Sequence, residues 1–355
     1  MTEISKRFLE QLIETPSPSG DEVAVQRLWI DYVKGFAHQI ETDGVGNVMA
    51  AVNPEKPFKV MLAGHCDEIA FMVSHIDGEG YIYITKAGGI NPKVALGMNV
   101  QILGHKGMLK GVVGVKPQHK GGPKDKIEMS DLYIDCGAAT KAEVEAYVTI
   151  GDYVIYDTTY EYLLNDRIVG RGLDNRTGAF IVAEVLRRVA DQNPNVAVYA
   201  VSTVNEETNM GGAYFAASHI NPTMAIACDV SFATDHPEMS PKESGAVALG
   251  KGPILSKGAP INKKINQLLE TAATTHNIPL QYELTPGSTG TDADRMRLTG
   301  KGVPVALVSL PLRYMHAPCE VASMKDIENE IELLVQMIMS LEGTESLNPL
   351  DEFKF

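Results

Sequence analysis

Two adjacent glutamates, Glu206 and Glu207, stand at the end of an apolar run, Val196–Val204, that predicts a buried strand. Two carboxylates in such a place repel each other, and burial disfavours the charge on both. A cation beside one glutamate would offset that cost, and the other glutamate would then be free to accept and donate protons. The alternative is a pair of solvated glutamates on an ordinary loop.

Five further polar side chains stand just past a predicted strand or in a turn that opens a helix. They are His65, Asp67, Asp174, Asp229 and His316. Because ligands bind at the carboxyl ends of the strands in open α/β sheets, we expect these side chains to converge. Histidine nitrogens and carboxylate oxygens form a ligand set that zinc, cobalt or manganese accepts. Each residue also has an ordinary explanation, as a helix N-cap or as a hydrogen-bonded loop residue.

Two metal ions would make use of this set of ligands. Sharing one carboxylate, they would sit roughly 3.5–4 Å apart and would together activate a water molecule and polarise a carbonyl group. One glutamate of the pair would bind metal, and the other would take the proton from the water. The residues alone leave the metal centre and the ordinary explanations both open.

The elements that would position these residues follow an α/β pattern at both ends of the chain. Helices are predicted over 4–13 and from Asp21, before strands at 47–52 and 59–63. Further along, the pattern predicts helices at 177–190, 212–218, 262–275 and 325–341, alternating with strands at 196–204, 223–228 and 303–309. Ser323 and Asp326 predict a capping box for the last helix.

Between about Phe71 and Leu164 the pattern changes to short apolar segments separated by Gly, Asp and Asn turns, with a brief helical stretch near 141–147. Such a pattern is typical of a small β-rich module. We therefore predict a discontinuous α/β domain, residues 1–69 and 165–355, interrupted by an inserted β-rich domain at residues 70–164.

The composition argues against several other classes of protein. The 355 residues are 44% hydrophobic and carry a net charge of −14, with a pI near 5.1, which is unlike a nucleic-acid-binding surface. The lysines at 116–126 lie in a Gly/Pro-rich segment typical of a solvated loop. No segment approaches membrane-spanning length, and the first residues lack the apolar stretch of a signal peptide. Four scattered cysteines predict free thiols, so we expect a cytoplasmic protein.

Seven separated segments form a recognisable set. They are Gly64–Val73, Gly88–Lys93, Asp131–Gly137, Gly172–Gly178, Glu206–Glu207, Cys228–Ser231 and Arg313–His316. In this order they resemble the M42 family of dinuclear metallo-aminopeptidases, the family of the tetrahedral and glutamyl aminopeptidases, and the resemblance covers nearly the whole chain. The departures, such as Ala70 where glycine is usual and Thr208–Gly211 after the glutamate pair, replace none of the expected ligands.

The resemblance implies a fold and an assembly. The fold is α/β, with a zinc-peptidase-like catalytic domain in which helices flank a central mixed sheet, and with an inserted small β-barrel of PDZ-like type. The insert would mediate dimerisation, and the dimers would assemble into a tetrahedral dodecamer.

The resemblance also implies a role for each candidate residue. The ligands would be His65 and Asp229 for one zinc or cobalt ion, Glu207 and His316 for the other, and Asp174 as the bridge between them. Glu206 would be the general base and acid, and Asp67 would orient His65. A cis peptide bond is implied after Asp174. The residues implied to lie near the substrate are Arg313, Tyr314, Thr291 and Asp292.

We therefore expect a metal-dependent aminopeptidase that hydrolyses N-terminal residues from peptides. The nearest alternative is a dinuclear-metal amidohydrolase of other specificity, either a carboxypeptidase or an N-acyl deacylase, which would activate water in the same way. A glycosidase would instead place two carboxylates on either side of the scissile bond without metal. A non-enzymatic scaffold would bind metal without turnover, although an unliganded Glu206 would then have no purpose.

Overall fold

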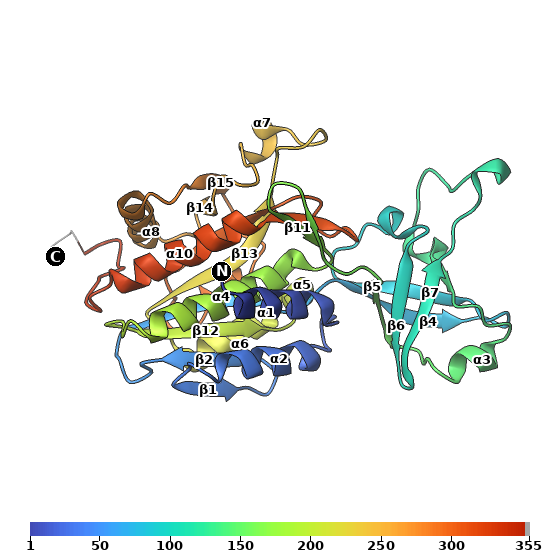
Figure 1. Ribbon diagram of the computed structural model, residues 1–355, viewed down its shortest axis with the longest axis horizontal. Coiled ribbons are helices and arrows are strands. Elements are labelled where there is room, and N and C mark those ends of the chain that lie inside the picture. Colours follow the sequence, from blue (N-terminus) through green and yellow to red (C-terminus); the bar gives the residue numbers. More distant parts are fainter. Residues whose placement is uncertain (352–355) are drawn as a thin grey trace.

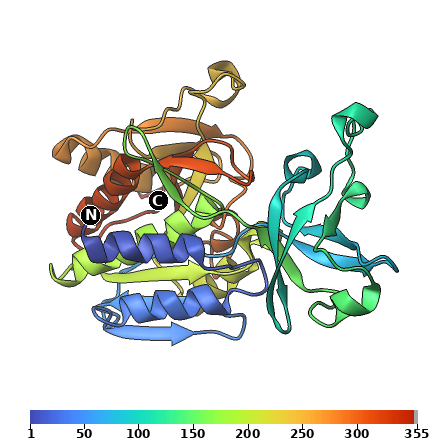
Figure 2. The same cartoon turned by 45° about the vertical axis from the view of Figure 1, so that its right-hand side comes forward.

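The chain forms an α/β body with a β-barrel at one side of it (Figure 1). The computed structural model describes residues 1–351, apart from the side chains of residues 243 and 244. Figure 2 shows the barrel standing apart from the body in a second view as well. The expected α/β fold with an inserted β-barrel is confirmed. None of the described helices is long and apolar enough to cross a membrane.

The body is built on an eight-stranded mixed sheet in the order β1-β2-β12-β3-β13-β16-β14-β15. Its strands are β1 (Gln39–Thr42), β2 (Val48–Val52), β3 (Lys59–His65), β12 (Ala197–Thr203), β13 (Met224–Phe232), β14 (Ile254–Gly258), β15 (Gln281–Thr285) and β16 (Val305–Leu312). The central strands β12, β3, β13 and β16 run parallel to one another. Their carboxyl ends therefore meet at one edge of the sheet, the place where ligands bind in such folds.

Helices cover both faces of this sheet (Figure 1). The first face is covered by α1 (Glu3–Glu14), α2 (Val23–Val33), α4 (Leu173–Ala190), α8 (Lys263–His276) and α10 (Met324–Met339). The second is covered by α6 (Gly211–Ile220) and α9 (Ala293–Met296). Within β3, Val60 and Leu62 belong to the first core cluster, whereas Met61 and Ala63 belong to the second. Burial on both faces explains why the central strands are continuous apolar runs in the sequence.

The barrel closes in the order β4-β5-β8-β7-β6-β9 and has an apolar core of its own. Its elements are β4 (Ala70–Ile76), β5 (Ile82–Ala87), β6 (Asn99–Gly104), β7 (Gly107–Val113), β8 (Tyr133–Asp135), α3 (Lys141–Glu145) and β9 (Tyr153–Tyr156). Beyond it, β10 (Glu161–Leu163) forms a second small sheet with β11 (Arg167–Gly170) and β17 (Glu320–Ser323). The barrel strands thus occupy residues 70–156, and the boundary predicted at residue 164 stays a prediction.

Two strands extend past the residues at which their ends were predicted. The strand expected to stop at Cys228 continues to Phe232 as β13, so Asp229 lies inside it, and β16 continues to Leu312. These two strands remain paired over this whole stretch, with Asp229 beside Ser309. Main-chain hydrogen bonds to a neighbouring strand thus continue the strand through the polar residue that suggested its end.

Only half of the predicted capping box forms at the start of α10. The hydroxyl of Ser323 accepts a hydrogen bond from the N–H of Asp326 at 3.4 Å. The carboxylate of Asp326 accepts instead from the N–H groups of Gly250, at 2.5 Å, and Gly252, at 2.7 Å. The carboxylate therefore ties the loop before β14 to the start of α10, a tertiary contact that the local sequence of the helix does not reveal.

Glu330 on α10 is fully buried, and neither oxygen of its carboxyl group has a hydrogen-bond partner among the described residues. Burial raises the pKa of this group well above its ordinary value of 4.5, and the charges of Asp229 and Asp326 raise it further. The pKa of Glu330 is higher in the folded protein than in the unfolded chain. Below about pH 4.5 the carboxyl is protonated in both states, and the contribution of Glu330 to the free energy of unfolding is fully present. This contribution is lost as the pH rises toward the pKa of Glu330 in the folded protein, because the unfolded chain ionises first.

Replacing Glu330 by glutamine should therefore flatten the pH dependence of stability. Above about pH 5, we expect the free energy of unfolding of E330Q to fall less steeply with rising pH than that of the wild type, by up to about 1.4 kcal/mol per pH unit. Urea unfolding followed by circular dichroism measures this slope. Glu332→Gln, two residues along the same helix, is the matched control. Equal slopes for wild type and E330Q would contradict the assignment.

Candidate metal centre

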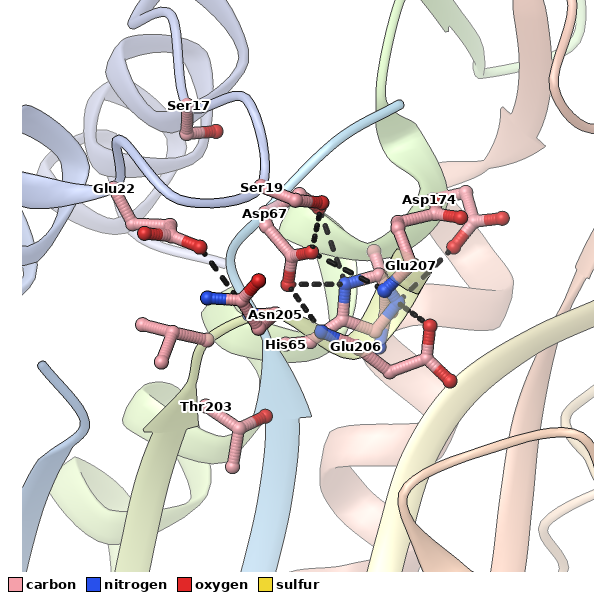
Figure 3. Close-up of polar contacts among 12 residues, drawn as sticks. Ser17, Ser19, Glu22, His65, Asp67, Asp174, Thr203, Asn205, Glu206 and Glu207 are labelled. Carbon is pink, nitrogen blue, oxygen red and sulfur yellow. Dashed lines mark hydrogen bonds and ion pairs between the residues drawn. The ribbon is translucent and has the colours of Figure 1, made fainter. Parts of the chain in front are cut away.

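The predicted metal ligands converge at the carboxyl edge of the central parallel strands, and Figure 3 shows the site around the glutamate pair. His65 is the last residue of β3, and Asp229 lies in the neighbouring strand β13. Glu206 and Glu207 open the short helix α5 (Glu206–Asn209), which follows β12. His316 lies in the connection from β16 to β17. The tertiary structure thus brings together residues that the sequence places at separate strand ends.

Asp174 stands between the two histidines with one carboxylate oxygen toward each. Its Oδ1 is 3.3 Å from Nε2 of His65, and its Oδ2 is 3.2 Å from Nε2 of His316. Asp174 lies in the first turn of α4, but its ψ of 106° is not helical, and its peptide bond to Asn175 is cis, as the family resemblance implies. A carboxylate that faces two imidazole nitrogens through separate oxygens is oriented as a bridging ligand would be.

The two glutamates face different histidines. Oε2 of Glu207 is 3.3 Å from Nε2 of His316, whereas Oε2 of Glu206 is 3.6 Å from Nε2 of His65. Oδ1 of Asp229 lies 3.9 Å from the same nitrogen of His65. Among the described residues, two groups are compact enough to hold an ion, namely His65 with Glu206 and Asp229, and His65 with Asp174 and Glu207. Because geometry alone also allows Glu206 as a ligand, its assignment as the base stays a prediction.

Asp67 holds the start of α5 and His65 in place (Figure 3). Its carboxylate accepts hydrogen bonds from the N–H groups of Glu206, at 3.0 Å, and Glu207, at 3.2 Å, and from the hydroxyl of Ser19, at 2.6 Å. Its main-chain oxygen accepts from Nδ1 of His65 at 3.1 Å. Because Nδ1 is occupied in this way, Nε2 faces the site. Asp67 therefore positions both glutamates as well as the histidine.

His316 and Asp174 are held by two residues, Gly89 and Glu320, for which the sequence predicted no role in the site. Nδ1 of His316 donates to the main-chain oxygen of Gly89, which follows β5, at 2.7 Å. A Cβ atom at residue 89 would lie 2.9 Å from that nitrogen, so the contact requires glycine. The buried carboxylate of Glu320 accepts from the N–H of His316 at 2.8 Å and from the N–H of Asp174 at 3.1 Å. One side chain thus positions two of the predicted ligands.

A buried ion-pair network supports the site from behind. Glu68, which follows Asp67, accepts hydrogen bonds from Arg171 at 2.9 Å and from Arg176 at 2.8 Å. Arg176 also donates to the main-chain oxygen of Thr15 at 2.7 Å. The network joins the end of α1 to β3 and α4. Removing one partner of such a buried pair costs about 3–5 kcal/mol, because it leaves the other charge uncompensated.

The crowding of carboxylates changes their affinity for protons. Burial raises the pKa of Glu206 to about 10 and that of Glu207 to about 7, and repulsion from neighbouring carboxylates contributes to both shifts. Burial opposes charge on His316 too, but hydrogen bonds to Asp174 and Glu207 outweigh it and raise the pKa of the imidazole to about 11. A divalent cation would favour the ionised carboxylates and the neutral imidazoles in their place.

The residues present fit a divalent cation. Oε1 of Glu207 is buried and has no hydrogen-bond partner among the described residues, a costly state that a bound ion would relieve. His65 and His316 each donate from Nδ1 to a main-chain oxygen and present Nε2 to the site. This is the usual arrangement of metal-binding histidines. The mixture of nitrogen and oxygen ligands suits zinc, cobalt or manganese.

The site opens into a cavity of about 990 Å³. Of the four residues predicted to lie near the substrate, Thr291 lines this cavity, and Asp292 is buried. Arg313 and Tyr314 are not among the residues that line it, and the guanidinium of Arg313 pairs with Asp235 at 2.7 Å. Their part in substrate binding stays a prediction.

Comparison with known proteins relates this site to a peptidase family. Residues 46–333 match the family described as M42 glutamyl aminopeptidase. A lysyl aminopeptidase from Pyrococcus furiosus is 34% identical over 352 residues, which make up 97% of this chain and 98% of the relative.

Solved structures are similar over the body and the barrel alike. A TET aminopeptidase from a marine sediment archaeon of the Thaumarchaeota superposes with a TM-score of 0.91 at 32% identity, covering 96% of this chain and 97% of the other. The TET1 peptidase of Pyrococcus horikoshii, described as able to assemble into a tetrahedron or a large octahedral shell, has a TM-score of 0.84 at 28% identity. The match covers 95% of this chain and 100% of that one.

Proposed function

Because the chain belongs to the M42 glutamyl aminopeptidase family and is an aminopeptidase, we propose that it removes N-terminal residues from peptides through a centre of two divalent metal ions. The observation that carries this proposal is the position of Asp174, with one oxygen toward His65 and the other toward His316. Imidazoles on both sides of one carboxylate suit a pair of ions better than a single ion.

Each ligand has a place in this proposal. The ions, zinc or cobalt, would be held by His65 and Asp229, by Glu207 and His316, and by Asp174 between them. When bound, they would lower the pKa of the attacking water and place positive charge beside the scissile carbonyl. The buried Oε1 of Glu207, which has no partner among the described residues, supports its assignment as a ligand.

Glu206 would move the protons of the reaction. It lines the cavity, and the hydrogen bond from its N–H to Asp67 holds it at the start of α5. Its carboxylate would accept a proton from the attacking water and then deliver it to the amine that leaves. Without metal, burial raises the pKa of Glu206 to about 10, so its carboxyl would hold a proton at neutral pH. The positive charge of bound ions would lower that pKa and free the carboxylate to accept the proton.

We also propose that the barrel mediates dimerisation and that dimers assemble into a closed dodecamer. Similarity to the Pyrococcus horikoshii peptidase over both the body and the barrel supports this assembly. A closed particle would admit only short or unfolded peptides. Light scattering should give a mass near twelve times the 38.5 kDa of one chain. A mass near that of a single chain would contradict the assembly.

A cytoplasmic location belongs to the same proposal. All four cysteines are free thiols in the structure, and Cys66 and Cys228 are buried. Free thiols persist most readily in a reducing compartment.

Chelation followed by metal restoration tests the proposed reaction. We expect release from free aminoacyl-anilides to disappear after exhaustive chelation and to return with zinc or cobalt, because the water needs the positive charge to ionise. Acyl-blocked peptides and peptides with a free carboxyl end serve as controls. Cleavage of the blocked peptides alone would indicate an N-acyl deacylase, and release from the carboxyl end would indicate a carboxypeptidase. Activity that survives chelation would rule out the metal centre.

A further inference from the structure

One wall of the cavity contains a carboxylate that the metal centre does not use. Glu283 on β15 lines the cavity together with Ser231 on β13. One oxygen of Glu283 accepts a hydrogen bond from the hydroxyl of Ser231, and the other accepts from the hydroxyl of Ser256 on β14. Ser256 and Glu283 are also paired in register between their strands. Two hydroxyls from two different strands thus hold the carboxylate in one position.

Within residues 1–351, Glu283 forms no ion pair with any described side chain. The cation beside it, Lys257 on β14, is paired with Glu270 at 2.8 Å and lies over the ring of Tyr282, 4.0 Å from its centroid. Neutral hydroxyls satisfy the hydrogen bonds of a carboxylate without balancing its charge. A partly buried carboxylate that faces a cavity without a counter-ion favours a cation in that cavity.

The spacing along β13 between Asp229, a predicted ligand, and Ser231, the partner of Glu283, is comparable to the length of one long side chain. Asp229 and Ser231 are two residues apart on β13, so they point to the same side of the strand and lie roughly 6.6 Å apart along it. Both line the cavity, and Glu283 is bonded to Ser231. Lysine carries its ammonium on a flexible four-carbon stem, which spans a comparable distance from the α-carbon. A residue with its carbonyl at the metal centre could therefore reach Glu283 with its side chain.

Exposed apolar side chains also line this cavity. Phe232 and Leu284 line the cavity, and they are 53% and 82% exposed, respectively. Each is the chain neighbour of one partner in the Ser231–Glu283 hydrogen bond. Methylene stems of lysine and arginine pack on such apolar surfaces while their charged ends bind elsewhere.

We propose that Glu283 selects substrates whose N-terminal residue is lysine or arginine, by accepting a hydrogen bond from the cationic end of that side chain. The proposal rests on the aminopeptidase reaction at the metal centre. Two cations also line the cavity, Lys242 on α7 (Pro241–Ser244) and Arg295 on α9. They would favour substrates whose N-terminal residue is acidic. Both are exposed, and Nε of Arg295 donates to the main-chain oxygen of Asn209 at 3.2 Å.

Substrates that differ only in charge test this proposal in the wild-type protein. Norleucyl-anilide has the four-carbon stem of lysine without the ammonium, so we compare it with lysyl-, arginyl- and glutamyl-anilide in the metal-loaded protein. We expect kcat/KM for lysine to exceed that for norleucine by about 10- to 100-fold. Equal values for lysine and norleucine, or a preference for glutamate, would overturn the proposal, the latter in favour of Lys242 and Arg295.

Variants of Glu283 separate recognition of charge from support of the fold. Glu283→Gln keeps the size of the side chain and should bring the lysine-to-norleucine ratio of kcat/KM close to unity, mainly through a loss of kcat/KM for lysine. Glu283→Lys should shift the preference toward glutamate. Glu55→Gln, an exposed site in the turn at the opposite end of β3, is the control and should leave the ratio as in the wild type.

The possible results distinguish this proposal from the proposed function. An equal loss of activity on every substrate in Glu283→Gln would mean that the residue only supports the sheet, and would overturn the specificity role. Turnover of norleucine without a preference for lysine would do the same and would leave the aminopeptidase reaction intact. Absence of turnover on any anilide would overturn both. If Glu283→Gln does not fold, the ratio of kcat/KM for lysyl- and norleucyl-anilide in the wild type still tests whether the protein selects a cationic N-terminal residue.

Discussion

Glu206→Gln is expected to lower kcat for aminoacyl-anilides by about 10²- to 10⁴-fold, the usual contribution of a general base, while both metal ions stay bound. Glutamine has the size of glutamate but cannot accept the proton of the attacking water. The main-chain hydrogen bond from residue 206 to Asp67 does not involve the side chain, so α5 should keep its position. Steady-state kinetics at saturating metal, together with metal content by mass spectrometry, measure the two effects separately.

Glu207→Gln is the matched control, since it makes the same change one residue along. Glu207 faces His316 at 3.3 Å, whereas Glu206 faces His65 at 3.6 Å. We expect Glu207→Gln to weaken metal binding, with its activity partly recovered at high metal concentration. Loss of metal from Glu206→Gln instead would make Glu206 a ligand, in agreement with the compact group that it forms with His65 and Asp229, and would contradict its role as the base.

Asp174→Asn is expected to reduce metal content below two ions per chain and to lower kcat/KM by more than about 100-fold, the upper range for residues that merely support a ligand. The two oxygens of Asp174 lie 3.3 Å and 3.2 Å from the Nε2 atoms of His65 and His316. Asparagine would present an oxygen to one side and an NH₂ group to the other, and an NH₂ group does not bind metal. Equilibrium dialysis with zinc or cobalt gives the stoichiometry.

Asp292→Asn provides the comparison for this substitution. Asp292 is also a buried carboxyl group near the site, but its Oδ2 accepts a hydrogen bond from the hydroxyl of Thr203 at 2.5 Å and faces neither histidine within salt-bridge distance. We expect Asp292→Asn to keep its full metal content. If Asp174→Asn retained two ions with wild-type affinity, the bridging role of Asp174 would be excluded.

The local sequence was a good guide to the central strands and to the long helices. Apolar runs such as residues 196–204 and 59–63 predicted β12 and β3 within a residue or two, because strands buried on both faces need apolar side chains at every position. The short outer strands β14 and β15 were not predicted. β15 is the edge strand of the sheet and β14 its neighbour, and in β15 the exposed Tyr282 and Leu284 break the pattern that identifies a buried strand.

The supporting residues of the site could not be predicted in the same way. Glu320, which positions Asp174 and His316, is separated from Asp174 by 146 residues, and Gly89 comes from the segment after β5. Gly89 lies in the segment Gly88–Lys93 that carries the family resemblance. The contacts of both residues nevertheless involve main-chain N–H and C=O groups, which every residue has, so residue types alone do not predict them. The same holds for Asp326, whose carboxylate binds the loop at Gly250 in place of completing the local cap.

Residue types and burial patterns are local properties, so the amino-acid sequence was sufficient to predict the chemical types of the ligands and the strands near which they stand, although not that β13 continues past Asp229. Which atoms face each other depends on the packing of the folded chain. The parallel pairing of β12, β3, β13 and β16 brings the strand ends together, and the position of Asp174 in the first turn of α4 directs one oxygen to each histidine. Such distances depend on the packing of the whole domain, and no segment of the chain specifies them alone.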